Sequence, residues 1–135
     1  MSQNRQASNV RQQILKLLEH LERLAQAVQG KSSMVRGSLY QRRCKCGKPG
    51  CRCAKGRLHR TAALSVYREG RSRPVSLKDI NLDRLAECVD NYRGFRKTRA
   101  EIVTTCALLL KAVDRLGKLR EIELRCFAHQ EKSSI

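Results

Sequence analysis

The sequence has few acidic residues, few aromatic residues and no long apolar run. Asp and Glu account for 12 of the 135 residues, against 29 Lys and Arg, so the formal net charge is +17 at pH 7. Trp is absent, and aromatic residues make up 4% of the chain. No stretch approaches the roughly 18 uninterrupted apolar residues of a membrane span. This composition argues against a membrane protein and favours a polyanionic partner.

The start of the chain, Met1-Ser-Gln-Asn-Arg, also lacks the apolar core of a secretory signal. We therefore expect a cytoplasmic protein, associated with the nucleoid if it binds DNA.

Catalytic signatures are missing as well. We find no Gly-rich phosphate loop, no Ser-His-Asp grouping and no carboxylate cluster of the kind that a two-metal nuclease needs. Tyr40, Tyr67 and Tyr92 remain as candidate nucleophiles, but we expect no enzyme.

The positive charge is concentrated in the middle third of the chain. Residues 36–78 hold thirteen Lys and Arg and one acidic residue, Glu69, which gives them a net charge of +12. A solvated helix interleaves both signs, whereas a nucleic-acid-binding surface concentrates one. We predict a nucleic-acid contact surface made of Arg42, Arg43, Lys45, Lys48, Arg52, Lys55, Arg57, Arg60, Arg68, Arg71 and Arg73.

Four of the seven cysteines lie within ten residues, in the string Cys44-Lys-Cys46-Gly-Lys-Pro-Gly-Cys51-Arg-Cys53. In a reducing compartment such a cluster indicates a metal rather than disulfides. The glycines and the proline between the cysteines let the chain fold back on itself. We expect Cys88, Cys106 and Cys126, which lie far apart in helical pattern, to be ordinary buried thiols.

Five candidate ligands compete for the four positions of a tetrahedral zinc ion. The site is either Cys44, Cys46, Cys51 and Cys53, or Cys46, Cys51 and Cys53 with His59. In both cases four protein ligands leave no open position for water or substrate, so we predict a structural Zn²⁺.

Apolar periodicity predicts helices at both ends of the chain. Val10, Ile14, Leu17, Leu21, Leu24 and Val28 follow one another in steps of three and four, which indicates a helix over 10–29 with Asn9 and Gln12 as its capping box. A second helical region opens near Asn81 and continues to about residue 127. It must break near Gly94 or Gly117, or pair in a coiled coil. We predict self-association through the seams around Leu21 and Leu109.

Between the helices, alternation predicts three strands over 38–43, 62–68 and 73–77, with a hairpin turn at Glu69-Gly-Arg-Ser and Pro74 on an edge strand. The expected fold class is α+β: a zinc-stapled three-stranded antiparallel sheet flanked by an N-terminal helix and a long C-terminal helical region with coiled-coil character. We divide the chain into an N-terminal helix and linker (1–35), a basic zinc-knuckle β domain (36–80) and a C-terminal helical region (81–135).

The knuckle also resembles a known family. Cys46-Gly-Lys-Pro-Gly-Cys51-Arg-Cys53, followed by Gly56, His59, a hairpin and Asn91-Tyr-Arg-Gly-Phe95, is similar to small bacterial proteins of unassigned activity that are often encoded near transposases. The resemblance covers residues 36 to about 105. It implies that Cys46, Cys51, Cys53 and His59 are the ligands and that Cys44 is an addition of this chain. It also implies a mobile-element setting. This chain departs from the family in having Arg60-Thr61, and not Gly-Pro, after the histidine.

We therefore expect a zinc-stabilised nucleic-acid-binding protein, an accessory or regulatory factor of a mobile element. Duplex DNA is favoured over single-stranded RNA because aromatic residues for stacking are scarce. The alternatives are an RNA-binding zinc module, an adaptor that binds a transposase or recombinase, and a thiol-based metal or redox sensor.

Overall fold

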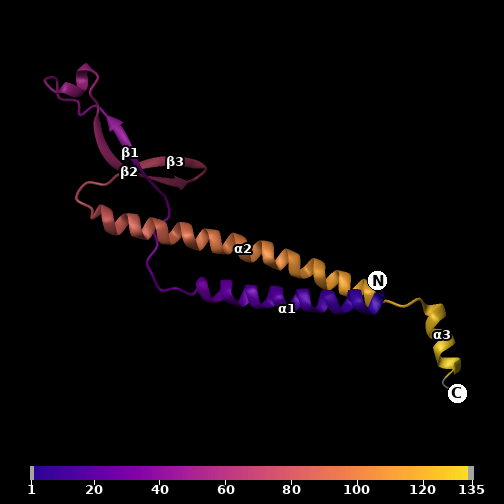
Figure 1. The fold of residues 1–135 in the computed structure, drawn as a ribbon. Helices are drawn as coiled ribbons and strands as arrows, with labels where there is room; N and C mark the ends of the chain where they lie inside the picture. Colours follow the sequence, from indigo (N-terminus) through magenta and orange to yellow (C-terminus); the bar gives the residue numbers. More distant parts are fainter. Residues whose placement is uncertain (1, 134–135) are drawn as a thin grey trace. The chain divides into compact units, whose positions relative to one another are not determined.

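A computed structural model describes residues 2–133 of the chain, and its elements follow one another as helix, sheet and helix (Figure 1). This confirms the predicted α+β fold class. The elements are α1 (Gln3–Ala27), β1 (Ser38–Cys44), the short 3₁₀ helix η1 (Arg52–Lys55), β2 (His59–Arg68), β3 (Arg71–Ser76), α2 (Leu82–Arg120) and α3 (Leu124–Ser133).

The chain forms two compact units whose limits differ from the three sequence segments. One unit joins the N-terminal residues up to Gly30 with the chain from Lys97 onward, and the other runs from Lys31 to Arg96. The boundary therefore falls inside α2, and the segment 82–96 of this helix belongs with the sheet. None of the described helices combines the length and the apolar character needed to cross a membrane.

Helix α1 begins seven residues before the predicted start, at Gln3 instead of Val10. The predicted capping box at Asn9 is wrong. Ser2 caps the helix instead, because its side chain accepts a hydrogen bond from the Arg5 backbone N–H at 3.4 Å. The apolar pattern also extends one turn upstream, where Ala7 is buried.

Within the first unit, α1 packs against the C-terminal part of α2. The Gln3 side chain donates to the Leu119 carbonyl at 3.0 Å, so the start of α1 lies at the end of α2 and the two helices are antiparallel. Val10 and Leu24 are buried on α1. The predicted apolar seam of α1, which includes Leu17 and Leu21, therefore packs within the chain, and these two side chains are half-buried.

The periodicity of α2 predicts a seam of Ile102, Cys106, Leu109, Val113 and Leu116, and the structure covers all of these residues except Val113. The covered positions after residue 100 are 102, 105, 106, 109, 112, 116 and 119, whereas Val113 is 46% exposed. Thr105 and Ala112 are the most buried of this set. Both are small, and the Thr105 hydroxyl donates to the Glu101 carbonyl at 2.7 Å, so it enters the seam without losing a hydrogen bond.

Helix α2 has no break at Gly94 or Gly117 and continues to Arg120. A single glycine inside a helix costs only about 1 kcal/mol relative to alanine, which the surrounding helical residues tolerate. The predicted opening near Asn81 is confirmed, because the Asn81 side-chain oxygen accepts from the Arg84 backbone N–H at 3.2 Å. Residues 121–123 then separate α2 from α3.

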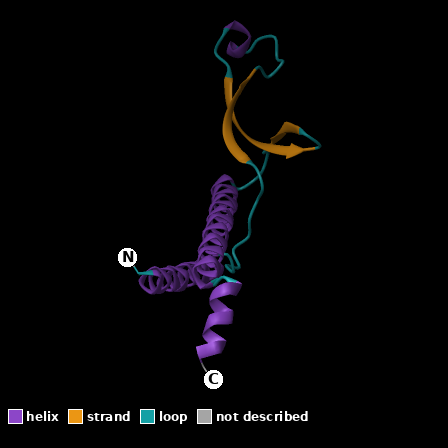
Figure 2. Ribbon diagram, turned by 90° about the vertical axis from the view of Figure 1, so that its right-hand side faces the viewer, coloured by secondary structure: helices purple, strands orange, loops and turns teal. Residues whose placement is uncertain are grey.

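The three strands form an antiparallel sheet of order β1-β2-β3, in which β2 is the long, curved central strand (Figure 2). Glu69 and Gly70 both have positive φ, 52° and 77°, and make the two-residue turn that matches strand twist. Pro74 lies on the edge strand β3, as predicted, where its missing N–H breaks no ladder.

The sheet buries little apolar surface. Ala63 and Leu64 are its only buried residues in the described strands, and every residue of β3 is exposed. The linker before β1 ties the sheet to α2: the Val35 backbone N–H donates to the Cys88 carbonyl at 3.0 Å. Asn91 donates to the Ser33 carbonyl at 3.1 Å. Cys88 and Val89 supply the buried side chains of this contact.

Self-association stays a prediction, and the structure moves it to other residues. Leu18 and Leu110 are 45% and 64% exposed, so they are free for a second copy, unlike Leu21 and Leu109. Replacing both Leu18 and Leu110 with Asp should lower the mass measured by sedimentation equilibrium without unfolding the helices. Gln12→Asp with Ala107→Asp, two exposed positions that add the same charge, is the control. A monomeric unmodified protein at high concentration would contradict the prediction.

Candidate metal centre and basic surface

Three short backbone features bring the cysteines of the knuckle together. Cys46 follows β1, and a turn then reverses the chain, with the Cys51 N–H donating to the Lys48 carbonyl at 3.2 Å and Pro49 in its second position. Cys51 caps η1, and Cys53 lies within it. Gly56 ends η1 with φ of 109°, a left-handed conformation that favours glycine, and the chain then enters β2.

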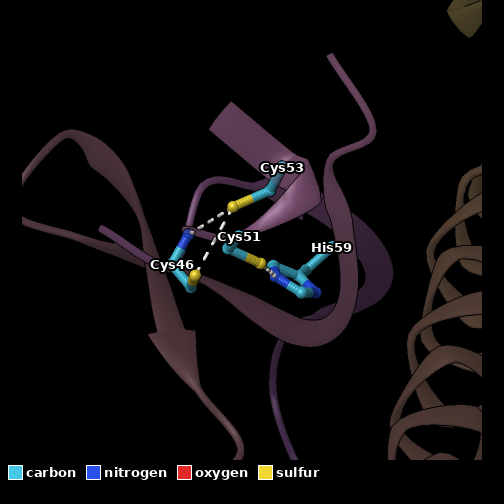
Figure 3. Close-up of side chains that lie close together, drawn as sticks. All are labelled: Cys46, Cys51, Cys53 and His59. Atoms are coloured by element: carbon cyan, nitrogen blue, oxygen red, sulfur yellow. Dashed lines mark hydrogen bonds between the residues drawn. The ribbon is translucent and has the colours of Figure 1, made fainter. Parts of the chain in front are cut away.

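Cys46, Cys51, Cys53 and His59 point toward one another in this loop (Figure 3). One ligand atom from each lies within 4.8 Å of all the others. The Cys46 and Cys53 sulfurs are 3.4 Å apart, and the Cys51 sulfur is 3.0 Å from His59 Nε2. His59 is the first residue of β2, so the cluster joins the loop to the central strand.

These separations fit a tetrahedral metal ion. With Zn–S bonds of about 2.3 Å, two sulfurs on one ion lie about 3.8 Å apart. This value falls between the 3.4 Å of the Cys46–Cys53 pair and the 4.8 Å that bounds the cluster, so a bound ion requires only small shifts of the ligands. Cys53 is 1% exposed, while Cys46 and His59 lie at the surface. The cluster can therefore hold a metal ion that is accessible from one side.

Hydrogen bonds already favour the thiolate form at two of the three sulfurs. The pKa of Cys51 is lowered by the backbone N–H of Cys53 and then by the His59 ring. The pKa of Cys53 is lowered chiefly by the Cys46 backbone N–H, which donates to its sulfur at 3.3 Å. At Cys46 the Lys48 backbone N–H lowers the pKa, but the neighbouring Cys53 and Cys51 thiols outweigh it, so the pKa is raised. A bound cation would favour the thiolate form at all three sulfurs.

Cys44, the alternative ligand, lies outside the cluster. It remains in β1 opposite His59, and its sulfur is 3.8 Å from the Thr61 hydroxyl. The structure brings together the cysteine and histidine set, and not the set of four cysteines. Cys88 is buried as expected and Cys106 is half-buried, but Cys126 is exposed, contrary to prediction, because the short helix α3 offers it no covering side chains.

All thirteen Lys and Arg side chains of residues 36–78 are exposed. None of them makes an ion pair with an acidic side chain in the described part of the chain, where the ion pairs are Arg84 with Glu87 and Arg125 with Glu123. Among the residues that the structure describes, the predicted contact residues therefore have no acidic ion-pair partner.

The strand register sorts these cations onto faces of the sheet. Arg43 is paired with Arg60, and Arg68 with Arg71, while Arg73 lies two residues along β3 from Arg71. Because paired residues share a face and successive residues alternate, these five arginines lie on the same face. Arg42, opposite Thr61, lies on the other face.

The remaining predicted contact residues belong to the knuckle. Arg52, Lys55 and Arg57 line a hollow of about 240 Å³ with no acidic residue in its wall. Lys45 and Lys48 lie in the loop before η1 and are exposed. The structure thus separates the predicted surface into a knuckle group, the sheet face that carries five arginines, and Arg42 on the opposite face of the sheet.

Arg36 and Arg96, neither of which was predicted as a contact residue, line one pocket together with Tyr67 and Tyr92. Sixty residues separate the two arginines in the chain, and neither lies in a motif. No local pattern could have paired them, because the linker and α2 meet only in the folded unit.

The two candidate ligand sets make opposite predictions for mutants. Cys44→Ser should leave metal affinity within about twofold, because the Cys44 sulfur lies outside the cluster, whereas His59→Ala should lower it at least tenfold by removing one of four ligands. Competition with a chromogenic zinc chelator measures both values. If Cys44→Ser is the weaker binder, the four cysteines form the site.

Comparison with known proteins gives one result. The family described as "Domain of unknown function (DUF6788)" matches residues 9–78, a range that takes in most of α1, the sheet and all four residues of the metal cluster. No curated protein and no solved structure gives a significant match. Because the match covers more than half of the chain, this protein belongs to the family of the domain of unknown function DUF6788.

Proposed function

We propose that this protein binds nucleic acid, with duplex DNA as the leading ligand, through a β domain held together by one structural zinc ion. The observation that carries the proposal is the set of thirteen exposed cations in residues 36–78 that have no ion-pair partner among the described acidic residues.

Zinc is the metal that best suits the donor set. Three sulfurs and one imidazole nitrogen are soft to intermediate ligands, which favour Zn²⁺ over the oxygen-seeking Mg²⁺ and Ca²⁺. Four protein ligands complete a tetrahedral site and leave no open position for catalysis. The Cys46 N–H that donates to the Cys53 sulfur would orient that ligand and stabilise its charge.

A metal ion would also supply stability that the sheet lacks. A three-stranded sheet folds independently only with an apolar face or a packed helix, and this sheet buries only Ala63 and Leu64. The ion would join Cys46 after β1 to His59 at the start of β2, at the end of the sheet remote from the linker. Metal binding and folding of this part are then linked.

The charge arrangement supports a polyanionic ligand. Arg43 faces Arg60 and Arg68 faces Arg71 across neighbouring strands, and like charges directly opposite each other destabilise a sheet. Phosphate groups bound between such pairs would remove the repulsion. The cations of the knuckle hollow, Arg52, Lys55 and Arg57, add a second set of phosphate contacts.

The proposal predicts one zinc ion per purified chain. Its removal with a chelator should raise amide hydrogen exchange throughout residues 38–76 while the paired helices α1 and α2 stay protected, because the helices bury Val10, Leu24 and Ala112 independently of the knuckle. Elemental analysis and hydrogen exchange by mass spectrometry make the two measurements. A metal-free protein with an intact sheet would refute the structural role.

The proposal also predicts a salt dependence of DNA binding. Log affinity should fall linearly with log salt, with a slope of about −0.9 for each phosphate contacted and ~5 contacts per chain. Changing Arg52, Arg57 and Arg71 to Gln should make the slope shallower by about two to three. Fluorescence anisotropy with a labelled duplex measures it.

The matched control removes the same charge from the end of α2, at Arg115, Lys118 and Arg120, which are also exposed. This variant should leave the slope nearly unchanged. Equal losses in both variants would mean that net charge alone drives binding. If neither DNA nor RNA binds, the adaptor function, in which the helices bind a transposase or recombinase, takes its place. Stronger retention on RNA than on DNA at equal salt would favour the RNA-binding module.

A further inference from the structure

A polar pocket of about 340 Å³ lies within the unit 31–96, apart from the metal cluster. Its size is at the lower end of the range of roughly 300–1,000 Å³ typical of small-molecule sites. No acidic side chain lines it. The lining residues are Arg36, Gly37, Ser38, Ser65, Tyr67, Ser72, Tyr92 and Arg96.

The sheet contributes four hydroxyl groups to one side of the pocket. Ser38 is paired with Ser65, and Tyr67 with Ser72. Ser65 and Tyr67 are two residues apart on β2, so all four side chains lie on one face of the sheet. This is the face opposite to the one that carries Arg43, Arg60, Arg68, Arg71 and Arg73.

The two arginines of the pocket belong to the linker and to α2. Tyr92 and Arg96 are four residues apart on α2 and so share a face of the helix. Arg36 lies in the linker, next to Val35, whose N–H donates to the Cys88 carbonyl of α2. The pocket thus joins the linker, the sheet and the helix of one compact unit.

Gly37 makes this arrangement possible by its close approach to β2. A Cβ atom at this position would lie 2.9 Å from Leu64 Cδ1 and 2.9 Å from the Ser65 carbonyl oxygen, and its φ is 153°. Only glycine lets the linker pass so near the strand. The close passage sets Arg36 and Ser38 on either side of Gly37 at the pocket.

The chemistry of the lining suits a nucleotide. Guanidinium groups and hydroxyls are the usual protein donors to phosphate oxygens. Tyr67 is 58% exposed at this pocket, and an exposed ring beside a phosphate site offers a stacking surface for a base. Two of the three tyrosines of the chain line this one pocket, although aromatic residues make up only 4% of the sequence.

We infer that this pocket binds one unpaired nucleotide, with its phosphate held by Arg36 and Arg96 and its base against the Tyr67 ring. The inference deepens the proposed nucleic-acid function and, in the case of a polymer ligand, rests on it. A stacked base pair does not offer its face to a ring, so the pocket would take a nucleotide from a single strand, a strand end or a flap. The opposite, arginine-bearing face would remain for duplex phosphates.

The test compares two labelled ligands, a single strand of about 12 thymidines and a blunt duplex of the same length, on the zinc-loaded full chain. Arg36→Gln with Arg96→Gln should weaken single-strand binding about tenfold and duplex binding about twofold or less. Arg93→Gln with Arg99→Gln removes the same charge from exposed positions of α2 that do not line the pocket, and should weaken both ligands about equally. Equal single-strand losses in the two double variants would overturn the inference.

A second pair of variants tests the contact between the base and the Tyr67 ring. Tyr67→Leu should weaken single-strand binding about tenfold, because a stacked base contributes roughly 1–3 kcal/mol, whereas Tyr67→Phe should retain most of the affinity. If Tyr67→Leu and Tyr67→Phe bind the single strand as tightly as the unmodified chain, no base stacks on this ring. Circular dichroism of each variant verifies that the sheet and helices are intact.

Three titrations test whether the pocket binds a nucleotide of a polymer or a free nucleotide. The ligands are deoxyadenosine monophosphate, inorganic phosphate and deoxyadenosine, and binding is monitored through the Tyr ring signals in NMR. The monophosphate should bind more tightly than either fragment, and Arg36→Gln with Arg96→Gln should abolish the difference. If the double variant abolishes this difference and the unmodified chain binds no polymer, the pocket is a free-nucleotide site and the proposed function fails. If the duplex binds but none of these ligands shifts the Tyr signals, the pocket inference fails and the proposed function stands.

Discussion

The β domain has a small core, and its architecture depends on what holds the strands in place. Of its strands, only β2 buries apolar side chains, at Ala63 and Leu64, and the edge strand β3 is exposed along its whole length. Burial of a few aliphatic side chains stabilises the folded state by a few kcal/mol. The conformational entropy that a segment of this length loses on folding costs more than that. The cluster of Cys46, Cys51, Cys53 and His59 therefore matters to the domain beyond its own loop, because it closes the chain between β1 and β2.

The other end of the sheet is secured differently. Here the linker forms backbone and side-chain hydrogen bonds to α2 through Val35 and Asn91, and Gly37 passes against Leu64. Buried Cys88 and Val89 belong to this contact. The segment 82–96 thus belongs to the same compact unit as the sheet, although it continues without a break into the part of α2 that packs against α1.

The unpaired cations cost stability in a domain whose apolar core is small. The thirteen exposed Lys and Arg of residues 36–78, a segment that holds one acidic residue, repel one another, and the cross-strand pairs of Arg43 with Arg60 and Arg68 with Arg71 add to the repulsion. A domain with little apolar burial retains such an arrangement at a cost in stability. A bound polyanion would offset that cost, and a metal ion coordinated by thiolates would hold the loop in place before the polyanion arrives.

The sequence predicted the elements well because their signals are local. The hairpin turn that opens at Glu69, the edge position of Pro74 and the helix opening at Asn81 all follow from the conformational limits of one or two residues, and the structure confirms each. The turn takes two residues and not the predicted four, because β3 begins at Arg71. The start of α1 was missed by seven residues because two capping residues, Ser2 and Asn9, compete in one polar stretch, and the periodicity upstream of Val10 is weak.

By itself the sequence determined the order of the elements, the concentration of charge in residues 36–78 and a short list of five candidate metal ligands. The tertiary structure decided which four ligands converge, because Cys44 stays in the β1 ladder while the loop turns the other three cysteines toward His59. It also decided that Thr105 and Ala112 are the most buried residues of the α2 seam, since close packing favours small side chains there. Only the fold brings Arg36 and Arg96 to one pocket, because their proximity depends on hydrogen bonds between a linker and a helix that lie far apart in the chain.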